Sequence, residues 1–216
     1  MRAKEVYRTG LKVEDVGGNC YVSAATCAMQ YLTGGEIDWN AKLLRSILER
    51  TNNYRFAIVA RFLEKETGVR FDDELVPVKK ERVRSCLTKN LMSGGMGILV
   101  ISSIGWVRDV VGGDVGWIEP KETHAVLVTG FYEPVGKSGK MWLYVADSYT
   151  RKLWFLPFDE VFDLLESIDS RAYMGMLSAT KKPRGDFGWW DKLLLDDIEL
   201  AVLKNAESRK KDLLNR

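Results

Sequence analysis

The spacing of apolar residues changes once along the chain, and this change restricts the fold more than any other sequence feature. Up to about residue 66, apolar positions recur every three or four residues, as they do in amphipathic helices. From Val69 onward, short apolar runs are separated by turn signals, which is typical of strands. Helices that precede a series of strands predict an α+β fold with an antiparallel sheet.

The same patterns predict individual elements. Residues 1–16 are polar and predict an extended or looped segment. Helices are predicted at 20–32, 39–50, 54–66, 80–91 and 158–168. Strands are predicted at 69–71, 74–78, 97–102, 124–132, 141–147, 152–157 and 173–178. The stretch 104–122 is rich in glycine and aromatic residues, and it predicts a long loop or loose hairpin that covers a cleft with Trp106 and Trp117.

The chain length of 216 residues fits one domain with an appendage. We expect the domain at 1–179, followed by a linker and a C-terminal amphipathic helix at 180–216. The linker contains proline and glycine, and the helix begins with Trp189-Trp190. Its apolar stripe predicts that it packs on the body of its own chain or on a second copy, which would give a homodimer.

Composition excludes several classes of protein. The net charge is +2, from 32 basic and 30 acidic residues, so bulk charge does not favour nucleic-acid binding. Hydrophobic residues make up 46% of the chain, which is too many for an intrinsically disordered protein. No apolar run reaches the ~18 residues that a membrane-spanning helix needs. We therefore expect neither a nucleic-acid partner nor a membrane span.

The scarce residues indicate a compartment and argue against a metal. The chain has three cysteines, an odd number that cannot pair completely and that suits a reducing compartment such as the cytoplasm. The first fifteen residues lack the apolar core of a signal peptide. Cys20, Cys27, Cys86 and the single His124 do not have the spacing of a zinc site. We expect no metal and no organic cofactor.

A glycine turn, Gly17-Gly18-Asn19, leads directly into Cys20 at the start of a predicted helix. The free N–H groups and the positive end of the helix dipole lie at this position. Both stabilise a thiolate, which is the nucleophilic form of cysteine, and the N–H groups also stabilise a developing oxyanion. Cys20 is therefore the candidate nucleophile, whereas Cys27 is expected in the core and Cys86 in a structural position.

The only histidine begins one predicted strand, and Asp147 ends the next strand across a hairpin. Neighbouring antiparallel strands joined in this way bring such side chains together. His124 and Asp147 are therefore candidates for a general base and the carboxylate that orients it. Taken singly, a cysteine at a helix start or an aspartate at a strand end is more often structural. Their conjunction in one chain favours catalysis.

These segments resemble the papain-like cysteine peptidases, and most closely their C39 and C39-like branch. The matching residues are Asn19-Cys20-Tyr21, His124-Ala125-Val126, Thr129-Gly130-Phe131 and Asp147-Ser148-Tyr149. The resemblance covers roughly residues 10–178. It implies a papain-like fold, in which a helix that begins with the cysteine packs on an antiparallel sheet that carries the histidine and the aspartate.

The match is incomplete before the cysteine. The family usually has a glutamine about five or six residues earlier, whose amide helps to stabilise the oxyanion, and here Glu14 and Asp15 stand at those positions. A carboxylate cannot donate a hydrogen bond unless it is protonated. Asn19 has a side-chain amide and is the candidate oxyanion-hole residue, although it also fits a simple helix cap.

The resemblance implies a thiol-dependent hydrolase, a cysteine peptidase that cleaves peptide or protein substrates through Cys20, His124 and Asp147. Two alternatives remain open. An acyl transferase would use the same triad, but the separation between Cys20 and His124 is much longer than in arylamine N-acetyltransferases or transglutaminases. A catalytically inactive papain-like interaction module is favoured by Glu14 and Asp15.

Overall fold

The fold was analysed in a computed structural model, which describes residues 3–13, 20–34, 69–135, 140–168 and 170–179. The helices predicted at 39–50, 54–66 and 189–215 lie outside these residues, and so does the linker that begins at 180. Asn19, Glu14 and Asp15 also lie outside them. The described part is α+β with an antiparallel sheet, which confirms the fold class predicted from the sequence.

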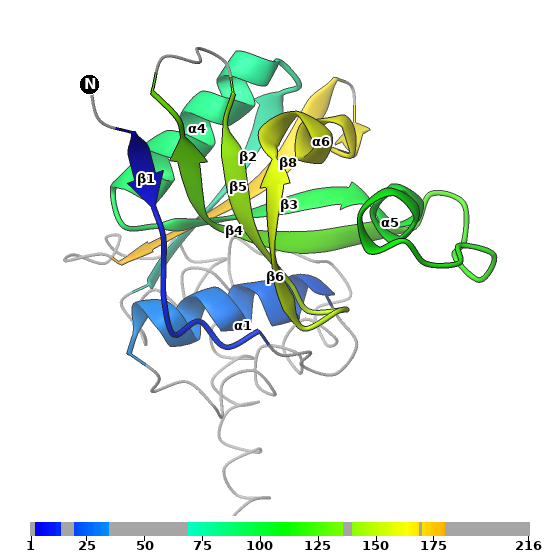
Figure 1. Cartoon of the computed structure of the whole chain (residues 1–216), viewed down its shortest axis with the longest axis horizontal. Helices are drawn as coiled ribbons and strands as arrows, with labels where there is room; N and C mark the ends of the chain where they lie inside the picture. Colours follow the sequence, from blue (N-terminus) through cyan, green and yellow to red (C-terminus); the bar gives the residue numbers. More distant parts are fainter. Residues whose placement is uncertain (1–2, 14–19, 35–68, 136–139, 169, 180–216) are drawn as a thin grey trace, which may run out of the picture.

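One antiparallel sheet forms the centre of the molecule (Figure 1). Six of its strands lie in the order β2-β8-β3-β4-β5-β6, and β1 and β7 pair with β4 and β8 respectively. The strands are β1 (Lys4–Val6), β2 (Val69–Pro77), β3 (Met96–Ser102), β4 (Thr123–Glu133), β5 (Trp142–Asp147), β6 (Lys152–Pro157), β7 (Ser167–Ile168) and β8 (Arg171–Ala179). The longest of them, β4, lies between β3 and β5 near the middle of the sheet.

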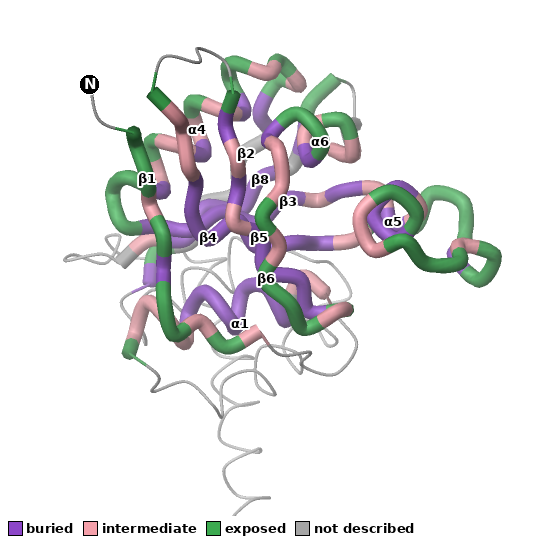
Figure 2. Tube along the Cα trace, viewed as in Figure 1, coloured by how far each residue is buried: buried purple, intermediate pink, exposed green. Residues whose placement is uncertain are grey.

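Helices cover both faces of this sheet. In Figure 1, α1 (Cys20–Leu32) lies below the sheet, while α4 (Lys80–Met92) and α6 (Phe158–Asp163) lie above it. A short helix, α5 (Ser103–Gly105), continues into a π-helix, η1 (Trp106–Val111), at the end of β3. The central strands are buried from both sides, as the purple trace in Figure 2 shows.

The sequence of β4 explains how one strand serves two cores. Ala125 and Leu127 face α1, where they pack with the small residues of that helix. Val126 and Val128 point to the opposite face and join the core beneath α4 and α6. Because both faces are buried, this strand is a continuous apolar run and does not alternate apolar and polar residues.

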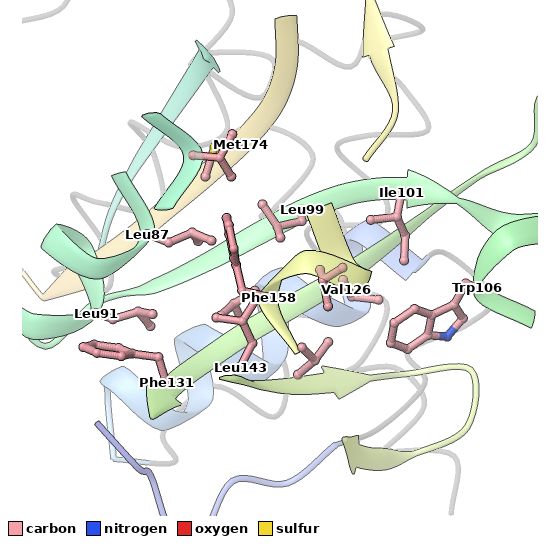
Figure 3. Close-up of a cluster of buried hydrophobic side chains, with 14 of the residues drawn as sticks. Leu87, Leu91, Leu99, Ile101, Trp106, Val126, Phe131, Leu143, Phe158 and Met174 are labelled. Carbon is pink, nitrogen blue, oxygen red and sulfur yellow. The ribbon is translucent and has the colours of Figure 1, made fainter. Parts of the chain in front are cut away.

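The two cores differ in the size of their side chains. The α1 side uses small residues, including Ala24, Ala25 and Ala28, which let the helix lie close to the sheet. The opposite core contains the large side chains drawn in Figure 3, which come from α4, η1, α6 and the strands between them: Leu87, Leu91, Leu99, Ile101, Trp106, Val126, Phe131, Leu143, Phe158 and Met174. The close approach of α1 brings its first residue, Cys20, to the sheet.

A buried arginine attaches the N-terminal segment to the body. Arg8 is only 8% exposed, and its guanidinium donates to the carbonyls of Thr129, Leu91 (3.3 Å) and Gly95 (2.7 Å). Burial lowers the pKa of this group, although a guanidinium stays protonated in proteins. Leu91 lies in the last turn of α4, where the helix dipole favours a cation. Arg8 therefore joins β1, α4 and β4.

The structure corrects three predictions. The strands predicted at 69–71 and 74–78 are one strand, β2, because β8 pairs with it along its whole length. The helix predicted at 158–168 ends at Asp163, since the following backbone bonds to β3 through Ser102 and Val100, and β7 then pairs with β8. The predicted loop at 104–122 begins with helical turns that bury Trp106.

The other predicted elements agree with the structure within one or two residues at each end: 20–32, 80–91, 97–102, 124–132, 141–147, 152–157 and 173–178. The predicted extended segment at 1–16 contains β1. Within the described ranges, no helix combines the length and the apolar character that crossing a bilayer requires.

A substitution at Gly130 tests the packing of β1 on β4. A Cβ added at Gly130 would lie 2.0 Å from the Val6 carbonyl oxygen and 3.2 Å from the Tyr144 ring, so the backbone of β1 would have to move. We expect Gly130→Ala to lower the free energy of unfolding by roughly 1–3 kcal/mol, measured by denaturant titration. Gly116→Ala is the matched control, because its Cβ meets nothing closer than 3.4 Å. Equal stability of the two variants would contradict this packing.

Candidate active site

Three elements bring the candidate catalytic residues to one end of the sheet. Cys20 is the first residue of α1, His124 is the second residue of β4, and Asp147 is the last residue of β5. β4 and β5 pair so that Leu127 lies opposite Ala146, which places Asp147 beside the beginning of β4. The structure therefore brings Cys20, His124 and Asp147 together, as the sequence analysis expects.

His124 lies between the other two residues. Its Nε2 is 2.6 Å from Asp147 Oδ1, which leaves Nδ1 as the ring nitrogen for a second partner. The imidazole and the Cys20 thiol line the same cleft, and each shifts the pKa of the other. The Ala125 N–H donates to Cys20 Sγ at 3.3 Å. A nucleophile, a base and a hydrogen-bonded carboxylate that orients the base thus lie together at one end of the sheet.

The carboxylate of Asp147 is fully buried, with 0% of its side chain exposed, and it accepts five hydrogen bonds. Oδ1 accepts from His124 Nε2 at 2.6 Å and from the Tyr149 N–H at 3.1 Å. Oδ2 accepts from the Thr150 hydroxyl at 2.7 Å, the Thr150 N–H at 3.1 Å and Trp106 Nε1 at 3.2 Å. Only an ionised carboxylate, which has acceptors alone, suits five donors.

The direction of the hydrogen bond between the Thr150 hydroxyl and Asp147 is set by a second partner of that hydroxyl. Trp154 Nε1 donates to the Thr150 hydroxyl oxygen at 3.1 Å. Since an indole N–H can only donate, the single hydroxyl proton of Thr150 remains for Asp147. Trp106 and Trp154 also contact each other edge to face, with ring centroids 6.4 Å apart. Two buried or half-buried indoles therefore hold the carboxylate in place.

These contacts shift the protonation of the thiol and the imidazole in opposite directions. Burial on its own raises the pKa of Cys20, but the hydrogen bond and charge of His124, with the N–H groups of Ala125 and Tyr21, outweigh it and lower the pKa below 9.0. Burial lowers the pKa of His124, but the hydrogen bonds and charges of Asp147 and Cys20 raise it from 6.5 to about 9. Both shifts favour the thiolate–imidazolium pair more than an isolated thiol and imidazole would.

The same balance keeps Asp147 ionised. Burial raises the pKa of its carboxyl group, but hydrogen bonds from His124 and Thr150, together with the charge of His124, lower it below its ordinary value of 3.8. A buried carboxylate beside an imidazole fixes the ring's orientation and stabilises its charged form. Asp147 can therefore orient His124 throughout the neutral pH range.

Cys20 and His124 open onto a cleft of about 180 Å³. Its inner wall comes from the turn after β3 and from η1, and its outer wall from the loop before β4 and the turn after β5. The lining residues other than the pair are Ser103, Trp106, Val107, Trp117, Ile118, Glu122, Thr123, Ser148 and Tyr149. The sequence analysis expected Trp106 and Trp117 in such a lining, and both are there.

Sequence reasoning missed the three residues that support Asp147 from behind. Trp106 was expected only in a covering flap, but it is completely buried and donates to the carboxylate. Thr150 and Trp154 were not identified at all. The overlooked signal for Thr150 is the Asp-x-x-Thr turn at a strand end, in which the hydroxyl reaches back to the carboxylate three residues earlier.

The remaining cysteines lie where the sequence analysis expected them. Cys27 is buried in α1, and its thiol donates to the Lys12 carbonyl at 3.0 Å. Cys86 is half-buried in α4. Cys20, Cys27 and Cys86 form no disulfide bond with one another. Within the described residues, no group of three or more histidine, cysteine, aspartate or glutamate side chains could hold a metal ion.

Comparison with known proteins adds no relative, because no protein-family model and no curated protein matches this chain.

Titration of the single histidine tests its hydrogen bond to Asp147. We expect the imidazole C–H resonance in NMR to titrate with an apparent pKa of about 9. Asp147→Asn removes the charge that raises the pKa and should move it down toward 6.5. Asp159→Asn, which neutralises an exposed aspartate paired with Lys80, is the matched control and should leave it near 9. A wild-type value near 6.5 would contradict the site described here.

Proposed function

We propose that this chain is a thiol-dependent hydrolase with a papain-like fold, most similar to the C39-like cysteine peptidases, that cleaves amide bonds in peptides or proteins. The observation that carries the proposal is the placement of Cys20 and His124 in one cleft, with His124 hydrogen-bonded to the buried Asp147. The position of Cys20 at the start of α1, against a sheet that carries the other two residues, supports the fold assignment.

The first chemical step is acylation of the thiol. The Cys20 thiolate attacks the carbonyl carbon of the scissile amide, forming a C–S bond while the C=O electron pair moves to the oxygen. As the oxygen re-forms its double bond, the C–N bond breaks, and His124 gives its Nδ1 proton to the leaving amine. Asp147 holds the ring so that this nitrogen faces the substrate. A thioester and a free amine result.

The second step releases the acyl group. His124, now neutral, takes a proton from a water molecule whose oxygen attacks the thioester carbon. The C–S bond breaks, and the products are a carboxylic acid and Cys20 as a thiolate beside protonated His124. The lowered pKa of Cys20 makes this thiolate a good leaving group. Neither step requires a metal or an organic cofactor.

We further propose the cytoplasm as the compartment. The chain has three cysteines, an odd number, and they form no disulfide with one another, which suits a reducing environment. An enzyme that depends on an unoxidised thiol also works best where glutathione and thioredoxin keep thiols reduced.

Selective alkylation tests the nucleophile. At about pH 6, iodoacetamide should modify Cys20 faster than Cys86, because His124 lowers the pKa of Cys20 and so raises its thiolate fraction. Cys86 is the matched comparator, since both thiols are half-buried. The rates follow from peptide mapping by mass spectrometry. His124→Ala should remove the preference, because it removes the largest contact that lowers the pKa of Cys20.

Equal labelling of Cys20 and Cys86 would overturn the hydrolase proposal and favour the inactive interaction module. If Cys20 is selectively reactive, the fate of its acyl group separates the remaining alternatives. A hydrolase passes the acyl group to water even when an amine is added. An acyl transferase passes it mainly to the amine.

A further inference from the structure

Two solvent-exposed aromatic rings lie at the mouth of the cleft. Trp117 is 58% exposed and Tyr149 is 53% exposed, yet the two rings stack with centroids 6.0 Å apart and an interplanar angle of 29°. Large apolar side chains exposed side by side mark a surface that binds a partner or a ligand. Both residues line the same cleft as Cys20 and His124.

The position of this pair is fixed to the catalytic residues. The Tyr149 N–H donates at 3.1 Å to Asp147 Oδ1, the oxygen that also bonds His124. Trp117 lies in a turn closed by the hydrogen bond from the Ile118 N–H to the Val115 carbonyl at 3.0 Å. These hydrogen bonds therefore fix the position of the Trp117–Tyr149 pair relative to the imidazole.

The cleft also has a buried apolar wall and one acidic side chain in its lining. Val107 and Ile118 are buried in its wall, next to the exposed pair. Glu122 is the only lining residue with a charged side chain besides the reactive pair, among the residues that the structure describes. Glu122 therefore disfavours a second carboxylate at its own position in the cleft.

The geometry of proton transfer determines which part of a substrate binds in the cleft beside His124. The walls around the reactive pair come from the segments next to His124 and Asp147: the turn after β3, the loop before β4 and the turn after β5. His124 gives its proton to the leaving amine, so that amine lies against the imidazole. Groups attached to the leaving amine then lie against the walls beside His124.

We infer that the cleft selects its substrate through the leaving group, which carries a large aromatic or apolar side chain next to the scissile bond and no negative charge near it. The inference rests on the proposed function, and it names the substrate class of that same site. The side chain stacks on Trp117 and Tyr149, and Glu122 disfavours an acidic neighbour. In peptide terms, the residue after the cleaved bond is aromatic or large and apolar.

The minimal leaving groups test this directly on the wild-type chain. Tryptophanamide, alaninamide and free tryptophan are titrated separately while the single His124 resonance is followed by NMR. Tryptophanamide should bind about tenfold more tightly than alaninamide, because stacking and apolar burial favour the indole ring. It should also bind more tightly than free tryptophan, which has the same ring but a carboxylate in place of the carboxamide.

Single substitutions identify the residues responsible for the preference for an aromatic ring and for the preference against a carboxylate. Trp117→Ala and Tyr149→Ala should each reduce the preference for tryptophanamide over alaninamide, and Glu122→Gln should reduce the preference over free tryptophan. Phe155→Ala is the matched control, because it removes an exposed aromatic ring on β6 outside the cleft. Equal binding of the two amides to the wild type, or an unchanged ring preference in both aromatic variants, would overturn the inference. Equal binding of tryptophanamide and tryptophan would overturn its charge requirement.

Acetylation of Cys20 by para-nitrophenyl acetate, followed by intact mass, tests the proposed function separately. Acetylation without any ring preference would overturn this inference and leave the hydrolase proposal standing. A ring preference without acetylation would support the binding surface and contradict the hydrolase proposal.

Discussion

The rest of the site depends on the hydrogen bonds that the buried carboxylate of Asp147 accepts. A charge without exposed surface is costly unless hydrogen bonds compensate for the lost water, and here five donors do so. Those donors belong to β4, η1 and the turn after β5, so the carboxylate joins three segments that are distant in sequence. Its charge also holds the imidazole proton that stabilises a thiolate at Cys20.

The sheet supplies the precision that this network needs. β4 is fixed on both sides by β3 and β5, and its register shifts once, between Val128 and Gly130. Val128 and Phe131 consequently face the same core, and the carbonyl of Thr129 turns to the buried guanidinium of Arg8. The irregularity lies at the far end of β4 from His124, so the strand that carries the imidazole stays regular where the site is built.

The positions of the candidate catalytic residues could be predicted from sequence, because each of these residues lies at the boundary of an element with a clear signal. Cys20 follows a glycine turn, and His124 and Asp147 begin and end strongly apolar strands. The supporting residues could not be predicted in the same way. Trp106 lies in a π-helix, whose residues do not show the period of an α-helix. The same limit applies to the fold, because the short strand β7 is defined by its backbone pairing with β8 and not by a sequence pattern.

The thiolate itself is the most direct test of this account. Its ultraviolet absorbance can be followed with pH in the wild type and in Cys20→Ser. The account predicts that the wild type gains one more thiolate than the variant at a pH clearly below 9.0, because protonated His124 lowers the pKa of Cys20 from that value. Identical absorbance of the two proteins until the pH approaches 9.0 would show that Cys20 is an ordinary thiol and would contradict it.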